Sequence, residues 1–307
     1  RRRMASILVI KLSALGDLLF AMPALQAIRR HHAGDLLVLL TAERFVPLMQ
    51  RSGLFDEVWA DRRPKWWQIG ALLDLRQRLL GPRFERVYDL QWSKRSDLYL
   101  GLLKASETFG ATPQARRIFA GRRAAQPIRQ RQADFLRLAG IESVPEPDLG
   151  FMAAETRGLA LPPRFALLVP GSSRGHLAKR WPVEGYADLA RGLAAAGLAP
   201  ISLCGPEERD LAAVLAQAGA RDIDASLALV ASLARLAAVV IGNDSGPTQL
   251  AALAGCPVVM LFGPAGDPAK LRPLVPVARV LSADPLDRLA AAEVLAAALE
   301  IARPAPV

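Results

Sequence analysis

Short apolar runs alternate with helical patterns through the first half of the chain. The runs at 7–10, 36–40, 58–59 and 87–90 have the length and composition of buried strands. Between them, apolar residues at 18, 21, 22, 25 and 28 have helical spacing. A short helix follows near Phe45, and an amphipathic helix is predicted over 66–80. Strands that alternate with helices in this way predict a doubly wound α/β domain.

The second half repeats the pattern. Strands are predicted at 165–169, 201–203, 239–241 and 258–262, and helices over 183–196, 227–237 and 286–302. Prolines at 145, 147, 162 and 163, together with weak periodicity, mark a boundary between the halves. We therefore expect two Rossmann-like domains, 1–155 and 156–307, that face a central cleft, with the final helix able to pack back on the N-terminal domain.

Composition narrows the class of protein. The chain has 307 residues, of which 52% are hydrophobic and 22% charged, as in ordinary globular proteins. Its 2 cysteines, Cys204 and Cys256, each stand beside an apolar run, which favours small core residues in a reducing compartment over disulfides. Only 3 histidines occur, so His-rich metal chemistry is not expected.

The net charge of +10 has three explanations: nucleic acid, an anionic membrane surface, or phosphorylated small molecules. No zinc-finger spacing, RNA-binding aromatic motif or basic heptad helix occurs, so we expect no nucleic-acid partner. Arginines crowd one region of the first half. They fit a solvated surface and a basic wall for an anionic acceptor or bilayer equally well; they are Arg116, Arg117, Arg122, Arg123, Arg129 and Arg131.

Four polar loops follow predicted strands, at 11–17, 171–179, 205–208 and 243–246. In the last of them, Gly246 and Pro247 open a helix whose N–H groups attract an anion, although most such turns are ordinary helix starts. The second-half loops together offer amides, hydroxyls, a lysine and carboxylates, which suits a nucleotide diphosphate. The chain contains neither a Walker motif nor a dinucleotide fingerprint.

Asp17 follows the first strand at the start of a helix. Such an acid commonly complements the helix dipole; the alternative is a general base that takes a proton from an acceptor hydroxyl. Lys11 either faces the same space or is merely exposed.

Four stretches resemble the family 9 glycosyltransferases, the heptosyltransferases of lipopolysaccharide core assembly. They are residues 7–23, 88–96, 169–182 and 242–264, in matching order and spacing. The resemblance implies a B-type glycosyltransferase fold and metal-independent, inverting transfer of a heptose from an ADP-sugar to a lipopolysaccharide-core-like acceptor. We therefore predict no metal and no cofactor.

The resemblance also implies residue roles. Asp17 matches the catalytic base, and Lys179 matches the lysine that neutralises donor phosphate. Donor-binding positions are Ser172, Ser173, Glu208 (with Glu207 as the other match), Asp244, Ser245, Gly246 and Gln249. Relatives mostly have His where Gln249 stands, and Gln keeps a hydrogen-bond donor but carries no charge. Acceptor-binding positions are Lys11, Ser13, Gln91, Lys94 and Arg95.

The sequence thus predicts a cytoplasmic glycosyltransferase that touches the inner face of the inner membrane. Its partners would be a nucleotide-sugar donor and an anionic, lipid-linked saccharide acceptor. Two alternatives remain: a sugar-nucleotide epimerase or hydrolase of the same fold, and a non-catalytic module that binds nucleotide sugars or lipopolysaccharide.

Overall fold

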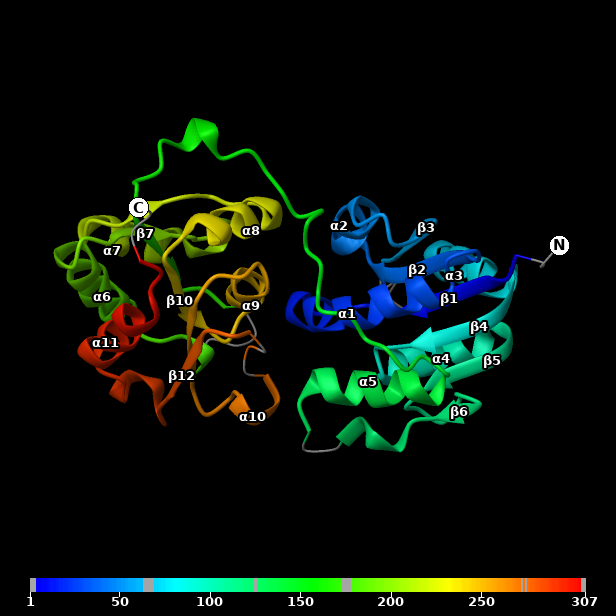
Figure 1. Cartoon of the computed structure of the whole chain (residues 1–307). Coiled ribbons are helices and arrows are strands. Elements are labelled where there is room, and N and C mark those ends of the chain that lie inside the picture. Colours follow the sequence, from blue (N-terminus) through cyan, green and yellow to red (C-terminus); the bar gives the residue numbers. More distant parts are fainter. Residues whose placement is uncertain are drawn as a thin grey trace. The chain divides into compact units, whose positions relative to one another are not determined.

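The computed structural model describes residues 4–62, 69–123, 126–172, 178–271, 273 and 275–304. The chain forms two compact units, Arg1–Phe151 and Met152–Val307 (Figure 1). Each is an α/β unit built on one six-stranded sheet, and every strand pair in both sheets is parallel. The predicted α/β class with Rossmann-like units is confirmed.

The first sheet has the order β3-β2-β1-β4-β5-β6. Its strands are β1 (Ser6–Ile10), β2 (Leu36–Ala42), β3 (Glu57–Asp61), β4 (Arg83–Asp89), β5 (Lys104–Gly110) and β6 (Arg117–Ile118). The helices of this unit are α1 (Leu15–His31), α2 (Val46–Arg51), α3 (Ile69–Leu80), α4 (Lys94–Leu102) and α5 (Ile128–Leu138), with 3₁₀ turns η1 (Glu43–Phe45) and η2 (Ala120–Arg123). The first residues of the helix predicted over 66–80, 66–68, lie outside the described residues.

The second sheet has the order β12-β11-β10-β7-β8-β9. Its strands are β7 (Phe165–Val169), β8 (Ala199–Ser202), β9 (Arg221–Asp222), β10 (Val239–Asn243), β11 (Val258–Phe262) and β12 (Ala278–Ser282). Its helices are α6 (Val183–Ala195), α7 (Arg209–Gln217), α8 (Leu227–Leu236), α9 (Gly246–Leu253), α10 (Pro268–Leu271) and α11 (Ala291–Ile301), with 3₁₀ turns η3 (Arg157–Leu159), η5 (Pro206–Glu208) and η6 (Leu286–Arg288).

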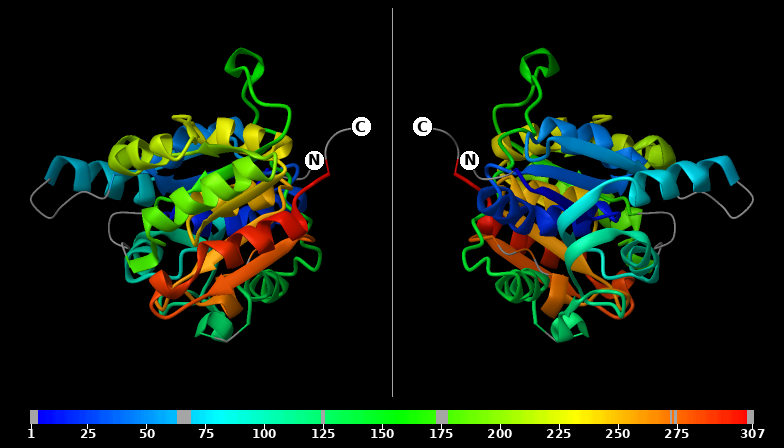
Figure 2. Two further views of the ribbon diagram at one scale, coloured as in Figure 1. Left: turned by 90° about the vertical axis from the view of Figure 1, so that its left-hand side faces the viewer. Right: turned by 90° about the vertical axis from the view of Figure 1, so that its right-hand side faces the viewer.

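Helices cover both faces of the second sheet (Figure 2). On one face α6 packs against both α7 and α11, and on the other α8 packs against α9. The central strands are therefore buried on both sides: β7, β10 and β11 have no exposed residue. The last helix, α11, packs within this second unit, on α6 and on β10, β11 and β12.

The predicted final helix over 286–302 proves to be two elements. The turn η6 ends at Arg288, Leu289 has extended backbone, and α11 begins at Ala291. The break has a physical reason: the buried indole N–H of Trp181 donates to the Leu289 carbonyl at 3.0 Å, which an uninterrupted helix would use internally.

In each sheet the order in which strands are added along the chain changes direction at one point, which lies between two adjacent strands. In the first unit these are β1 and β4, and in the second β7 and β10. Ligands of open α/β sheets bind beyond the carboxyl ends of the strands at such a switch point. The loops that follow Ile10, Asp89, Val169 and Asn243 stand at these two positions. No helix among the described residues is both long and apolar enough to cross a bilayer.

Candidate functional site

In the first unit, Asp17 lies in the first turn of α1, directly beyond the carboxyl end of β1. Its Oδ2 accepts a hydrogen bond from the Ala14 N–H at 3.1 Å, and the side chain is half-buried. The preceding residue also borders open space, because a Cβ on Gly16 would meet no heavy atom within 4 Å. The carboxylate is thus both a helix-start acid and a group that a substrate hydroxyl can approach.

The charge of one arginine, Arg131, interacts with that of Asp17. Arg131 comes from α5, which packs on α1. Burial lowers the pKa of the Arg131 guanidinium, and the charge of Asp17 opposes that shift. One arginine of the arginine-rich region is therefore half-buried and close enough to the candidate catalytic carboxylate for their charges to interact.

Lys11 and Asp89 are two further charged residues of this unit, and both are buried. Lys11 is 4% exposed, and its Nζ donates to the Leu90 carbonyl at 3.3 Å. Burial lowers the pKa of this ammonium, while the charges of Asp17 and Asp89 act in the opposite direction. Burial also raises the pKa of Asp89 to about 6, against the hydrogen bonds that its carboxylate accepts. Lys11 thus lies inside the unit, below its surface.

The other predicted acceptor-binding residues lie around the same edge. The Gln91 side-chain carbonyl accepts from the N–H groups of Leu12 and Ser13, at 2.9 and 3.1 Å. Lys94 is exposed at the first turn of α4. Arg95 makes a bidentate ion pair with the buried Asp61, at 3.0 and 3.1 Å, so its guanidinium is held in one orientation.

In the second unit, Lys179 and Asp244 meet at the entrance of α9. The Lys179 ammonium donates to Asp244 Oδ2 at 2.6 Å, and the two side chains are 18% and 9% exposed. Ser245 precedes the helix, and its hydroxyl is 3.0 Å from that of Thr248. An ammonium held beside a helix N-terminus is an arrangement that binds anions.

The close packing of this entrance explains a glycine and an asparagine. A Cβ on Gly242 would lie 2.3 Å from Thr248 Oγ1, so no larger residue fits there. Asn243 is fully buried. Its side-chain carbonyl accepts from the backbone N–H of Trp181 at 3.0 Å and from the Tyr186 hydroxyl at 3.2 Å, and its side-chain amide donates to the Pro170 carbonyl at 2.7 Å. Asn243 therefore ties the loop after β7 to the end of β10.

Arg180 connects two predicted donor-binding residues. Its guanidinium donates to the Ser172 carbonyl at 2.9 Å and hydroxyl at 3.2 Å, and it is 3.4 Å from Glu208 Oε1. Glu208 also accepts from the Gly205 N–H at 3.0 Å, whereas Glu207 is exposed. Ser173 lies outside the described residues. Sequence reasoning missed Arg180 and Asn243, although a polar residue that closes an apolar strand, as Asn243 does, is a usable signal.

Gln249 points into the core of the second unit. Its side chain is 2% exposed, and its amide N–H donates to the Leu271 carbonyl at 2.8 Å and to the Met260 sulfur at 3.2 Å. In this arrangement Gln249 joins α9 to α10. Within the described part of the chain, no group of three or more His, Cys, Asp or Glu side chains is arranged to hold a metal ion.

Comparison with known proteins identifies the family of this chain. The model of glycosyltransferase family 9 (heptosyltransferase) matches residues 72–293. The lipopolysaccharide core heptosyltransferase OpsX of Haemophilus influenzae is 23% identical over 277 residues, 84% of this chain and 78% of that protein.

Two solved structures share the fold. The family 9 glycosyl transferase of Veillonella parvula has a TM-score of 0.80 at 20% identity, over 97% of both chains. The E. coli heptosyltransferase WaaC, solved with ADP, has a TM-score of 0.78 at 21% identity, over 97% of this chain and 100% of that one. The chain therefore belongs to glycosyltransferase family 9, the heptosyltransferase family, and is an enzyme of the glycosyltransferase class.

Proposed function

We propose that the protein transfers a heptose from an ADP-sugar to an anionic, lipid-linked saccharide of the lipopolysaccharide core, with inversion at the anomeric carbon. The observation that carries this proposal is the Lys179–Asp244 pair at the start of α9, which places a cation beside a helix N-terminus. The relative OpsX acts in lipopolysaccharide core synthesis, and WaaC was solved with ADP, which supports the substrate class.

The second unit would bind the donor. The N-terminal N–H groups of α9 and the Lys179 ammonium would hold the diphosphate, because an ammonium has three donors and Asp244 uses one of them. Glu208, fixed by Arg180 and Gly205, would accept from the ribose hydroxyls. Ser172, Ser173 and Ser245 would add hydroxyl contacts to the diphosphate.

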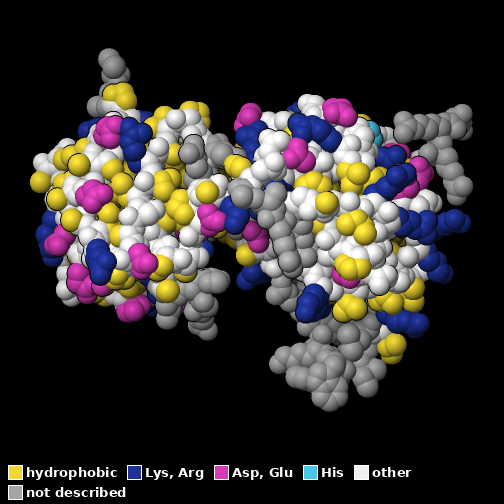
Figure 3. Space-filling view, turned by 90° about the horizontal axis from the view of Figure 1, so that it is seen from below, with side chains coloured by type: hydrophobic (Ala, Val, Ile, Leu, Met, Phe, Trp, Pro, Cys, Tyr) yellow, Lys and Arg dark blue, Asp and Glu magenta, His cyan; other side chains and the backbone are white. Residues whose placement is uncertain are grey.

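The first unit would bind the acceptor, and its charge suits that partner. Residues 1–151 carry 25 Lys or Arg against 15 Asp or Glu, whereas residues 152–307 carry 14 of each. The whole net charge of +10 thus belongs to the first unit, and Figure 3 shows Lys and Arg side chains along its right-hand edge. Lys94 and the oriented Arg95 would meet phosphate or carboxylate groups of the acceptor.

The reaction would be a single displacement. Asp17 takes the proton of the acceptor hydroxyl while the oxygen of that hydroxyl forms a bond to the anomeric carbon of the donor. The bond from that carbon to the diphosphate oxygen breaks on the opposite side. Negative charge grows on the leaving ADP, and Lys179 and α9 stabilise it. In this scheme those groups supply the positive charge without a metal, so we expect a chelator to leave turnover unchanged.

A transfer assay read by mass spectrometry tests the proposal, with ADP-heptose and a core saccharide acceptor. Asp17→Asn should lower kcat by about 100-fold or more, since general-base catalysis contributes about 10²–10⁴-fold, while ADP affinity changes little. Lys179→Met should weaken ADP binding by about tenfold or more. Turnover close to that of the wild type in Asp17→Asn would disprove the base assignment.

The same assay separates the alternatives. An epimerase or hydrolase would convert the donor in the absence of acceptor, and a non-catalytic module would bind both ligands without forming product.

We further propose that the enzyme works in the cytoplasm against the anionic inner leaflet, since the basic first unit would be attracted there. Co-sedimentation with anionic vesicles, but not with neutral ones, is the result expected.

A further inference from the structure

Two loops of the first unit are bound to each other at the switch point of its sheet. The loop 11–17 leaves β1 and carries Asp17, and the loop 90–93 leaves the adjacent strand β4. Oε1 of Gln91 joins them by accepting from the N–H groups of Leu12 and Ser13, and the Lys11 ammonium, which donates to the Leu90 carbonyl, is a second link. Those N–H groups belong to the segment whose next residue, Ala14, donates to the Asp17 carboxylate. Gln91 thus binds Ser13, and the next residue along the chain makes the contact that orients Asp17.

Gln91 is itself held from below. The Asp89 carboxylate, which is fully buried, accepts from the Gln91 N–H at 2.8 Å and from the Trp92 N–H at 3.2 Å. Its other oxygen accepts from the Ser96 hydroxyl at 2.8 Å, in the first turn of α4. These contacts maintain an unusual backbone, because Trp92 has φ of +53°, a region that non-glycine residues rarely adopt. Strained backbone of this kind persists only where surrounding contacts fix it.

The side chain of Gln91 is already committed by these contacts. A carbonyl oxygen has two lone pairs, and both are used by Leu12 and Ser13. The residue that the sequence resemblance places among the acceptor-binding groups therefore faces the backbone of the Asp17 loop through its acceptor atom.

We propose that Gln91 is a positioning residue for Asp17. It fixes the loop 11–17 through two N–H groups, with Asp89 as its support, and it does not bind the acceptor. This inference rests on the proposed role of Asp17 as general base. Its physical basis is that loss of the Gln91 carbonyl removes the acceptor that the N–H groups of Leu12 and Ser13 share, so the loop relaxes toward solvent. A displacement of about 1 Å at a reacting group costs about 100-fold in rate.

Two substitutions at one position test the role of the acceptor atom. Gln91→Met keeps length and volume but removes the carbonyl, and Gln91→Glu keeps an oxygen that accepts both N–H groups while removing the amide donor. We expect Gln91→Met to lower kcat by about 10- to 100-fold with both KM values within about twofold of the wild type. Gln91→Glu should restore kcat to within about threefold of the wild type.

Gln130→Met is the matched control, since Gln130 is exposed on α5 and bonds to Asp134. It should leave all kinetic constants unchanged. Thermal melting of each variant shows that the first unit is folded, and a Gln91→Met protein that unfolds early is assayed below its transition. If Gln91 bound the acceptor through its amide N–H, Gln91→Glu would raise the acceptor KM and fail to restore activity, and that outcome overturns the inference.

The Asp17→Asn variant separates this inference from the proposed function. If Asp17→Asn retains turnover, the base assignment itself is wrong. If Asp17→Asn is inactive while Gln91→Met has a normal kcat, the base assignment stands and the positioning role of Gln91 is wrong.

Discussion

At the scale of single residues, two carboxylates near one sheet edge have opposite environments. Asp17 is half-buried and its carboxylate accepts from the Ala14 N–H, whereas Asp89 is fully buried. Burial opposes the ionisation of Asp89, although Ser96, Gln91 and Trp92 donate to its carboxylate. The residue that holds the loop is therefore ionised at a cost in folding free energy.

That cost predicts a pH dependence of stability. The pKa of Asp89 is about 6 in the folded protein and 3.8 without the fold, so the native state binds more protons between these values. The contribution of Asp89 to the free energy of unfolding therefore falls as pH rises from about 4 to about 6, by on the order of 2 kcal/mol. Asp89→Asn lacks this change. The Tm of the variant minus that of the wild type should increase across this window in calorimetry; two parallel curves would contradict the prediction.

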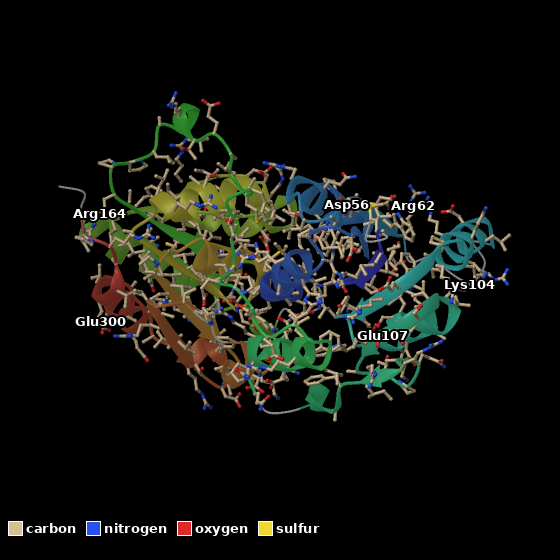
Figure 4. The ribbon with its side chains drawn as sticks, turned by 45° about the vertical axis from the view of Figure 1, so that its right-hand side comes forward. Asp56, Arg62, Lys104, Glu107, Arg164 and Glu300 are labelled. Carbon is tan, nitrogen blue, oxygen red and sulfur yellow. The ribbon has the colours of Figure 1, made fainter. Side chains whose placement is uncertain are left out.

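At the scale of elements, one arginine of the segment after α11, Arg303, binds the ends of two helices of the second unit. The Arg303 guanidinium donates to the carbonyls of Arg235 and Ala237, which follow or end α8, and to that of Gly255 just beyond α9. Its backbone N–H donates to Ala238, and its carbonyl accepts from Arg164, labelled in Figure 4. A cation at two helix C-termini complements both helix dipoles.

Arg303→Met should therefore lower the free energy of unfolding by about 1–3 kcal/mol, because three backbone carbonyls lose a charged donor. Arg279→Met is the control. Arg279 pairs with Glu300 of α11, also labelled in Figure 4, but both side chains are about half exposed, at 47% and 57%. An exposed pair contributes at most about 1 kcal/mol. Equal losses in the two variants, measured by urea unfolding, would refute the role of Arg303.

Sequence patterns predicted the elements whose apolar residues are continuous or regularly spaced. The buried central strands of both sheets and α1 follow from apolar runs and helical spacing. The pattern did not yield α5, because its arginines dilute the signal of the buried Phe135 and Leu136. The edge strands β6 and β9 have two residues each, and both residues of each strand are exposed, which leaves no hydrophobic pattern to read.

The candidate site was predictable where it depends on strand ends, and less so where it depends on tertiary contacts. The positions of Asp17, Lys179 and Asp244 follow from loops after strands. Arg180 was missed because its partners, Ser172 and Glu208, come from separate loops. The direction of Gln249, toward Leu271 and Met260, depends on how α10 packs, and helical spacing alone carries no such information.

At the scale of the whole molecule, the charge is divided unequally between the units. All of the net charge lies in residues 1–151, and residues 152–307 are neutral overall. An anionic acceptor would thus be attracted by the first unit at long range, whereas the donor would be held by short-range contacts in the second. Long-range attraction is screened by salt, and contacts inside a binding site are screened much less.

The acceptor KM should therefore rise several-fold as ionic strength goes from about 0.05 to about 0.3 M, while the donor KM changes by less than about twofold. Steady-state kinetics in a series of sodium chloride concentrations measures both constants. A donor KM that rises in step with the acceptor KM would show that the charge of the first unit does not act on the acceptor selectively.

The parallel strand order also determines when each unit can fold during synthesis. In the first sheet, β1 lies between β2 and β4, so its pairing is complete only after residue 89 has been made. In the second, β7 waits for β10, which ends at Asn243. Contacts this distant along the chain form slowly. Because no strand of the first sheet comes from beyond Phe151, that unit can finish folding on the ribosome while the second is still being translated.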